Sequence, residues 1–128
     1  KYAKDNGFSD SLHITGWVDD PMSYVELFDV ACLLSRWEGF GLALPEYMIA
    51  GKPIVASRVD AIPNIIRDGE NGLLVEVDDD TGASNAVLRI YQEDGLKDRL
   101  VTQGFEDVHN RFNARRVSEE HGKLFERL

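Results

Sequence analysis

Cysteine is nearly absent from the sequence. Its single cysteine, Cys32, leaves no partner for a disulfide within the 128 residues, and such cysteine usage is typical of a reducing compartment. We therefore expect a cytoplasmic protein. Cys32 lies in the apolar run 30–34, where a buried thiol is usually inert, so the sequence predicts a small core residue rather than a nucleophile.

Long apolar runs are also absent. None approaches the roughly 20 residues that a helix needs to cross a bilayer, so we expect no transmembrane segment. The opening residues 1–7 lack both the apolar stretch of a signal peptide and an initiator Met. We accordingly expect the chain to be part of a longer one.

Basic residues are few. The 14 Lys and Arg residues stand against 23 Asp and Glu residues, which gives a net charge of −9. Broad contact with nucleic acid or with anionic lipid needs a basic surface, so this composition excludes both as main partners.

Metal-ligand spacing is missing as well. The three histidines are scattered along the chain, without the short intervals that ligands of one ion require. The run 78–80 has an Asp-x-Asp spacing, but it precedes an expected helix, and capping of that helix by Asp80 or Thr81 is the prediction. No residue is assigned to a metal.

Short apolar segments alternate with helical patterns along the whole chain, which we expect to form one domain over 1–128. Continuous apolar strands between helices predict an α/β fold, a Rossmann-like parallel sheet with helices on both faces. The expected strands are 12–16, 29–34, 53–57 and 72–77. The expected helices are 22–28, 41–50, 62–67, 80–93, one over 96–108 and a last one over 117–128.

The loop 35–42, Ser-Arg-Trp-Glu-Gly-Phe-Gly-Leu, leaves an expected strand and enters a helix. In such sheets ligands bind at the carboxyl ends of strands, and glycines with free amides can approach phosphate. The loop is not a dinucleotide fingerprint, because Leu44 stands where the third glycine would be. It is not a P-loop either, because no Gly-Lys-Ser/Thr follows.

Two glutamates lie eight residues apart, Glu38 in this loop and Glu46 on the helix that follows it. Both could face one crevice. In so acidic a chain the spacing alone leaves a second interpretation open, with Glu38 near the helix dipole and Glu46 solvated.

Several segments together resemble one family. They are Glu-Gly-Phe-Gly-Leu at 38–42, Glu-Tyr-Met at 46–48 and Ala-Gly-Lys-Pro-Ile-Val-Ala-Ser at 50–57, with Gly-Trp-Val-Asp-Asp at 16–20 and Asp-Gly-Glu-Asn-Gly-Leu-Leu-Val at 68–75. In this order they resemble the retaining glycosyltransferases of the family 4 (glycosyl transferases group 1) type. The resemblance implies the C-terminal, donor-binding half of a GT-B fold.

The resemblance also implies roles for particular residues. Glu38 contacts the donor sugar and is the catalytic residue, while Glu46 hydrogen-bonds the nucleotide ribose. Backbone amides of the loop bind the donor phosphates, and the segment around Val18 lines the base. The implied donor-binding positions are Gly39, Phe40, Gly41, Leu42, Glu46, Val18 and Asp19. Transfer retains the anomeric configuration, and no metal or other cofactor is expected.

The expected partners are a nucleotide-sugar donor and the family's N-terminal acceptor domain. We expect that domain, and a first strand with basic residues, to lie outside these 128 residues. We expect any peripheral membrane contact to be made by that N-terminal half. The sequence departs from the family at Asp60-Ala61, where many relatives have two glycines, and at Asn64, where they have glutamate. It does not identify the base, the sugar or the acceptor.

Two alternatives stay open beside the transferase. One is a sugar-nucleotide epimerase of the same GT-B fold, and the other is a non-catalytic ligand-binding or interaction module. The glutamate pair with its glycine-rich loop favours an enzyme, since a scaffold has no need of it.

Overall fold

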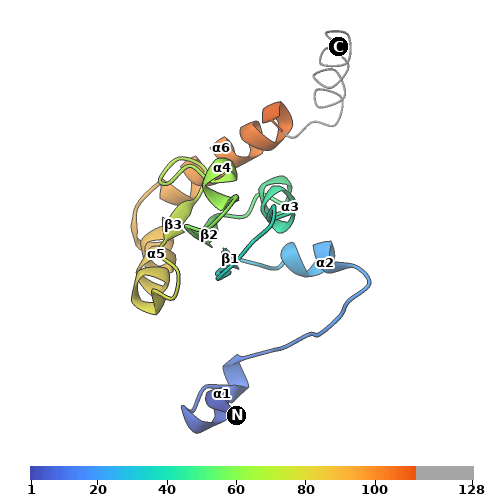
Figure 1. Cartoon of the computed structure of the whole chain (residues 1–128), viewed down its shortest axis with the longest axis vertical. Coiled ribbons are helices and arrows are strands. Elements are labelled where there is room, and N and C mark those ends of the chain that lie inside the picture. The colour runs from blue at the N-terminus through green and yellow to red at the C-terminus, as the bar shows by residue number, and fades with distance from the viewer. Residues whose placement is uncertain (112–128) are drawn as a thin grey trace.

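The computed structural model of this chain describes residues 1–111, and the helix expected over 117–128 lies outside them. Parallel strands alternate with helices over most of this range (Figure 1). The helices are α1 (Tyr2–Asp5), a 3-10 turn (Ser9–Ser11), α2 (Pro21–Val25), α3 (Ala43–Ile49), α4 (Ile62–Ile65), α5 (Asp80–Gln92) and α6 (Leu96–Arg111). The strands are β1 (Ala31–Leu33), β2 (Ile54–Ser57) and β3 (Leu73–Val75).

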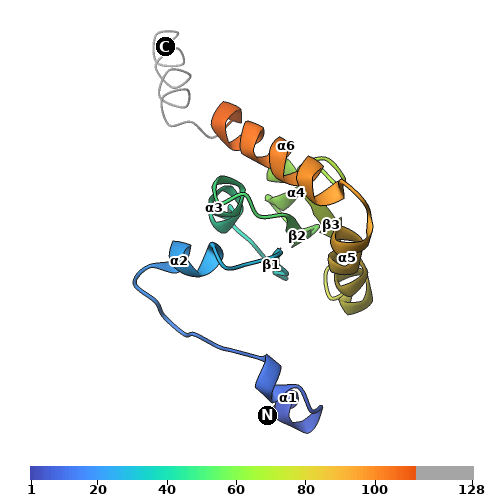
Figure 2. The ribbon, with the colours of Figure 1, turned by 180° about the vertical axis from the view of Figure 1, so that it is seen from behind.

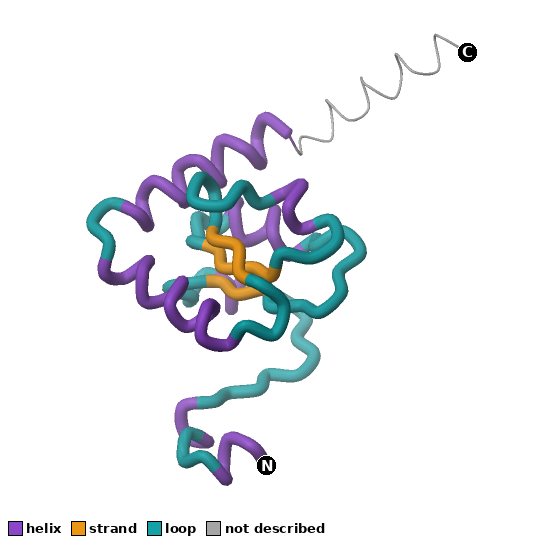
Figure 3. The backbone as a smooth tube through the Cα atoms, turned by 60° about the vertical axis from the view of Figure 1, so that its left-hand side comes forward, coloured by secondary structure: helices purple, strands orange, loops and turns teal. Residues whose placement is uncertain are grey.

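The strands form one parallel sheet in the order β1-β2-β3, with Ala31 opposite Ile54 and Val55 opposite Leu73. Figure 3 shows the sheet at the centre, with helices around it. All four residues of β2 are buried, because this central strand is covered on both faces and has a neighbour at each edge. The α/β prediction is therefore confirmed.

Alternate residues of β2 belong to two separate cores. Ile54 and Ala56 pack with Leu44 and Met48 of α3, in a cluster that also includes residues of α4 and α6. Val55 packs on the other face, with residues of β3, α5 and the start of α6. Figure 2 shows α3 and α5 on opposite sides of the strands. The prediction of helices on both faces holds because side chains alternate across a strand.

The strand expected over 12–16 is wrong. These residues run extended and exposed between the first short helices and α2, away from the sheet (Figure 1). Ile14 is 85% exposed there. An extended segment becomes a strand only when a neighbouring strand bonds to its backbone, and no described residue supplies that neighbour.

Cys32 is not the core residue that the sequence predicts. Its side chain is exposed, because β1 is an edge strand and successive side chains point to opposite faces. Ala31 takes the buried position and is fully covered. Partial desolvation still raises the pKa of the Cys32 thiol, which favours the neutral, unreactive form.

A buried polar network joins the turn before β3 to α6. Asn71 and Asp107 are 1% and 6% exposed, and the Asn71 amide donates to Asp107 Oδ2 at 2.6 Å and to the Ile65 carbonyl at 3.1 Å. The backbone N–H of Arg67 donates to Asn71 Oδ1 at 2.7 Å, and the Arg67 guanidinium lies 3.0 Å from Asp107. The network fixes the turn that sets the position of β3.

We expect Asp107→Ala to lower the free energy of unfolding by about 3 kcal/mol, because it leaves the amide of Asn71 and the charge of Arg67 without their buried partner. Urea denaturation followed by circular dichroism measures the change. Glu106→Ala is the matched control, since Glu106 is the exposed neighbour on the same helix, and it should shift the value by less than about 0.5 kcal/mol. Equal effects of the two substitutions would show that the network contributes nothing.

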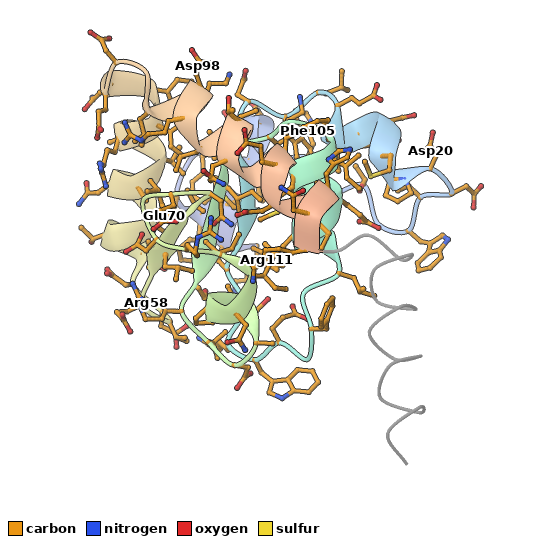
Figure 4. The ribbon with its side chains drawn as sticks, turned by 90° about the horizontal axis from the view of Figure 1, so that it is seen from above. Asp20, Arg58, Glu70, Asp98, Phe105 and Arg111 are labelled. Carbon is orange, nitrogen blue, oxygen red and sulfur yellow. The ribbon has the colours of Figure 1, made fainter. Side chains whose placement is uncertain are left out.

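At the end of α6, Arg111 holds α4 in place. Its guanidinium donates to the carbonyl of Asn64, and Figure 4 shows Arg111 beside α4. The Asn64 side chain itself is exposed, so this departure from the family pattern leaves the packing of α4 intact.

Within residues 1–111, no helix combines the length and the apolar character needed to cross a membrane.

Candidate functional site

Loops from all three strands meet at the carboxyl edge of the sheet. The loop after β1 carries Glu38, whose backbone N–H donates to Asp60 Oδ2 at 2.9 Å. The same loop carries Arg36, whose guanidinium lies 2.7 Å from Asp78. Asp60 follows β2 and Asp78 follows β3, so the chain after each of the other two strands contacts the loop at one point. The Asp78 carboxylate, by hydrogen bond and charge, raises the pKa of Arg36.

The Glu38 side chain folds back on its own loop. It is half-buried, and its Oε2 accepts from the Ser35 hydroxyl at 3.2 Å. Its Oε1 accepts from the backbone N–H of Gly41 at 3.3 Å. This N–H group of Gly41 is one of the backbone amides that the family resemblance assigns to the donor phosphates. The carboxylate and a phosphate oxygen would therefore compete for one N–H group.

Gly41 lies where the backbone conformation and a close neighbour both disfavour a side chain. Its φ is 73°, and a Cβ built there would lie 3.1 Å from Leu44 Cδ1. Left-handed backbone and this close approach both favour glycine. Helix α3 begins at Ala43 rather than at Gly41, because Gly41 bends the chain before the first helical bond, from the Leu44 N–H to the Gly41 carbonyl. A Cβ at Gly39 would meet nothing, so no such constraint acts there.

Glu46 lies in the first turn of α3, and its side chain is exposed. Its carboxylate takes part in no hydrogen bond or ion pair with any residue of 1–111. The loop side chains of Phe40 and Leu42 are 50% and 72% exposed. The Glu46 carboxylate, unpaired within residues 1–111, thus lies close to a loop with exposed apolar side chains and backbone N–H groups.

Val18 borders a separate hollow of about 310 Å³. Tyr47, the neighbour of Glu46 on α3, forms part of its wall, and this places the two predicted regions next to each other. The residues around the hollow are His13, Thr15, Val18, Pro21, Tyr24, Val25, Phe28 and Tyr47. Desolvation, followed by the charge of Glu46, raises the pKa of Tyr47, so its hydroxyl stays protonated and can donate.

The two aspartates after Val18 differ in what they do. Asp19 is exposed. Asp20 caps α2, because its carboxylate accepts from the backbone and hydroxyl groups of Ser23, and these bonds lower the pKa of Asp20. Figure 4 shows Asp20 beside α2. Between residues 1 and 111, no hydrogen bond joins Val18 or Asp19 to the loop that carries Glu38.

The acidic run 78–80 does cap α5, as predicted, but through a different residue. Asp79 accepts from the backbone N–H of Gly82 at 2.8 Å, and Asp80 is already the first residue of the helix. A Cβ at Gly82 would collide with the Asp79 carboxylate. Over the described range, no three His, Cys, Asp or Glu residues gather in a way that could hold a metal ion.

Asp60 and Asp78 are the site residues that sequence reasoning missed. Asp60 is visible in the sequence only as a departure from the family pattern, and Asp78 only as part of an acidic run. No local signal connects either residue to the loop after β1, because the contacts span 22 and 42 residues of chain.

Comparison with known proteins identifies the family. A family model described as glycosyl transferases group 1 matches residues 1–93. Lipopolysaccharide core biosynthesis glycosyltransferase LpsE of Rhizobium meliloti is 31% identical over 124 residues, which cover 97% of this chain and 36% of that protein. Phosphatidyl-myo-inositol mannosyltransferase of Mycobacterium leprae is 36% identical over 105 residues, or 80% of this chain and 28% of that protein.

Solved structures agree. Sucrose-phosphate synthase from Thermosynechococcus elongatus has a TM-score of 0.87 at 27% identity, over 98% of this chain and 32% of that one. The C-terminal domain of a group 1 glycosyl transferase from Francisella tularensis has a TM-score of 0.79 at 25% identity, over 88% of this chain and 60% of that one. Anabaena HepE in complex with UDP-glucose shares the fold, with a TM-score of 0.89 at 18% identity, over 98% of this chain and 35% of that one.

The chain therefore belongs to the glycosyl transferases group 1 family, and its fold is that of a GT-B glycosyltransferase. It spans about a third of the length of the curated relatives it matches.

Proposed function

We propose that this chain supplies the donor site of a retaining glycosyltransferase, which moves a sugar from a nucleotide-sugar to an acceptor. The observation that carries the proposal is the carboxylate of Glu46, which has no partner within residues 1–111 and lies beside the loop of Glu38 and Gly41, in a member of a glycosyltransferase family. Carboxylates accept strongly from hydroxyl groups, which makes Glu46 suited to a ribose and Glu38 to a sugar.

In this proposal the donor diphosphate lies against the loop, with Gly39 and the amides of Phe40, Gly41 and Leu42. A phosphate oxygen accepts from the Gly41 N–H, which in the structure donates to the Glu38 carboxylate. The displaced Glu38 carboxylate is then free to turn towards the donor sugar. Donor binding would thus release the Glu38 carboxylate for its catalytic role.

The base occupies the hollow beside Val18, with Asp19 at its rim. Tyr47 joins this hollow to α3, so base and ribose would bind on consecutive residues, Tyr47 and Glu46. Aromatic and apolar side chains suit a nucleobase, which presents a flat apolar face. The solved UDP-glucose complex of HepE, a protein of the same fold, supports a nucleotide-sugar as the class of donor.

The reaction is departure of a nucleoside diphosphate from an anomeric carbon. It needs a fixed sugar and stabilised phosphate charge more than a strong base. This chain has a net charge of −9, and Arg36, the one cation in the loop, is paired with Asp78. We infer that further positive charge and the acceptor site come from the rest of a longer cytoplasmic protein, that any peripheral membrane contact lies there too, and that no metal or other cofactor is needed.

The test is an assay of the full-length protein with UDP-, GDP- and ADP-sugars. We expect one of them to yield a glycoside with the anomeric configuration of the donor, as read by NMR, while the 128-residue chain alone transfers nothing. A product of inverted configuration, or transfer by the chain alone, would contradict the proposal. Conversion of the donor sugar without transfer would favour an epimerase, and binding without reaction a non-catalytic module.

A further inference from the structure

Asp60 adopts a left-handed backbone conformation that is uncommon for residues other than glycine. Its φ is 46°, and Asp60 and Asp78 are the only residues other than glycine with positive φ in the range 1–111. Left-handed backbone crowds the Cβ of every L-residue and is kept only where the surroundings impose it. At Asp60 the family resemblance predicts glycine, which would adopt this conformation without strain.

The strained aspartate makes one contact that glycine cannot make. Its Oδ2 accepts from the backbone N–H of Glu38 at 2.9 Å. The backbone of Asp60 is anchored at both ends. It lies in a short connection between Ser57 and Ile62, which are 2% and 0% exposed. Backbone bonds from Val59 to Ser57 and from Ile62 to Val59, both 3.0 Å long, close this connection.

We propose that Asp60 is a positioning residue, which fixes the backbone of Glu38 so that its carboxylate keeps a defined place when donor binds. This inference rests on the proposed function of Glu38. The other contacts of Glu38, with Ser35 and Gly41, are made by its side chain and are lost when that side chain turns to the sugar. The bond to Asp60 is made by the backbone and persists through that turn.

A group held within a narrow range of positions loses less freedom on the way to the transition state. Loss of the Asp60 bond should therefore lower kcat more than it weakens donor binding. The stability of the fold should not fall with it, because glycine at position 60 relieves the left-handed strain while it removes the acceptor.

Three variants of the full-length protein test the proposal. Asp60→Gly fits the backbone but cannot accept the hydrogen bond, whereas Asp60→Asn keeps an acceptor oxygen and tolerates left-handed backbone. Asp94→Gly is the matched control, since it makes the same change of residue at an exposed position in the turn between α5 and α6, outside the loops of the candidate site.

We expect Asp60→Gly to lower kcat about tenfold, with a donor KM within threefold of wild type and an unchanged or higher melting temperature. Asp60→Asn should recover most of kcat, and Asp94→Gly should change kcat less than twofold. In the 128-residue chain, amide exchange of Glu38 followed by NMR should become at least tenfold faster in Asp60→Gly and stay close to wild type in Asp94→Gly.

Wild-type turnover in Asp60→Gly would overturn the proposal. So would a loss of kcat that follows a fall in melting temperature and that Asp60→Asn does not restore, because this pattern marks a folding role. Normal turnover of Glu38→Gln would instead refute the function assigned to Glu38 itself, and Asp60 would then have no catalytic group to position. The Glu38 variant thus distinguishes the two failures.

Discussion

Replacement of Glu38 by glutamine in the full-length protein is expected to lower kcat about a hundredfold, which corresponds to about 2.7 kcal/mol on the barrier. Glutamine keeps the size of the side chain and one acceptor but removes the charge. If Glu38 holds a sugar hydroxyl while positive charge develops at the anomeric carbon, that charge acts more strongly in the transition state than in the ground state. Affinity for nucleoside diphosphate should stay nearly unchanged.

A capping role makes a different prediction for the same variant. In the structure Glu38 does accept from the Gly41 N–H, and loss of a cap costs about 1 kcal/mol of stability with little effect on turnover. Melting temperature and kcat measured on one preparation separate the two roles, with Glu106→Gln as a surface control. A Glu38→Gln enzyme that melts earlier yet turns over normally leaves Glu38 as a cap and nothing more.

Replacement of Glu46 by alanine should weaken nucleoside diphosphate binding at least tenfold. One carboxylate can accept from both ribose hydroxyls, and bonds to charged groups contribute about 1.5–3 kcal/mol each. Because Glu46 is exposed and has no partner among the described residues, its removal should change the free energy of unfolding by less than about 0.5 kcal/mol. Glu46→Gln keeps one neutral acceptor and should fall between wild type and alanine.

Isothermal titration calorimetry with the nucleoside diphosphate of the active donor measures this affinity. Glu70→Ala is a control of equal charge change, since Glu70 is also exposed and lies in the turn that leads to β3. An affinity for Glu46→Ala equal to that of the control would exclude the ribose contact.

The sequence was most informative where a segment is covered on both faces. Residues 53–57 read as a buried strand because Ile54, Val55 and Ala56 are apolar in succession, and β2 occupies 54–57 with every residue buried. It was least informative where a segment depends on a distant partner. In residues 12–16 the apolar Leu12 and Ile14 alternate with polar side chains, which is also a strand-like pattern, but an extended segment needs an adjacent strand, and local pattern cannot report whether one is there.

The candidate site shows the same division. The loop after β1 could be located from the sequence, because its glycines lie between an expected strand and an expected helix, and β1 and α3 flank it in the structure. The contact of Asp60 with Glu38 could not, because it depends on how the loops after β1 and β2 meet in space. The capping residue of α5 was missed by one position for a simpler reason, since three consecutive aspartates offer equivalent caps and backbone geometry selects Asp79.

Hydrogen–deuterium exchange of the full-length protein, with and without saturating UDP, GDP or ADP, tests the central claim most directly. If this chain holds the donor site, the nucleotide that binds should slow exchange in the loop 38–42, at the start of α3 and around Val18, with little change in α6. A nucleotide that binds with measured affinity but slows exchange only outside these segments would show that the donor site lies elsewhere.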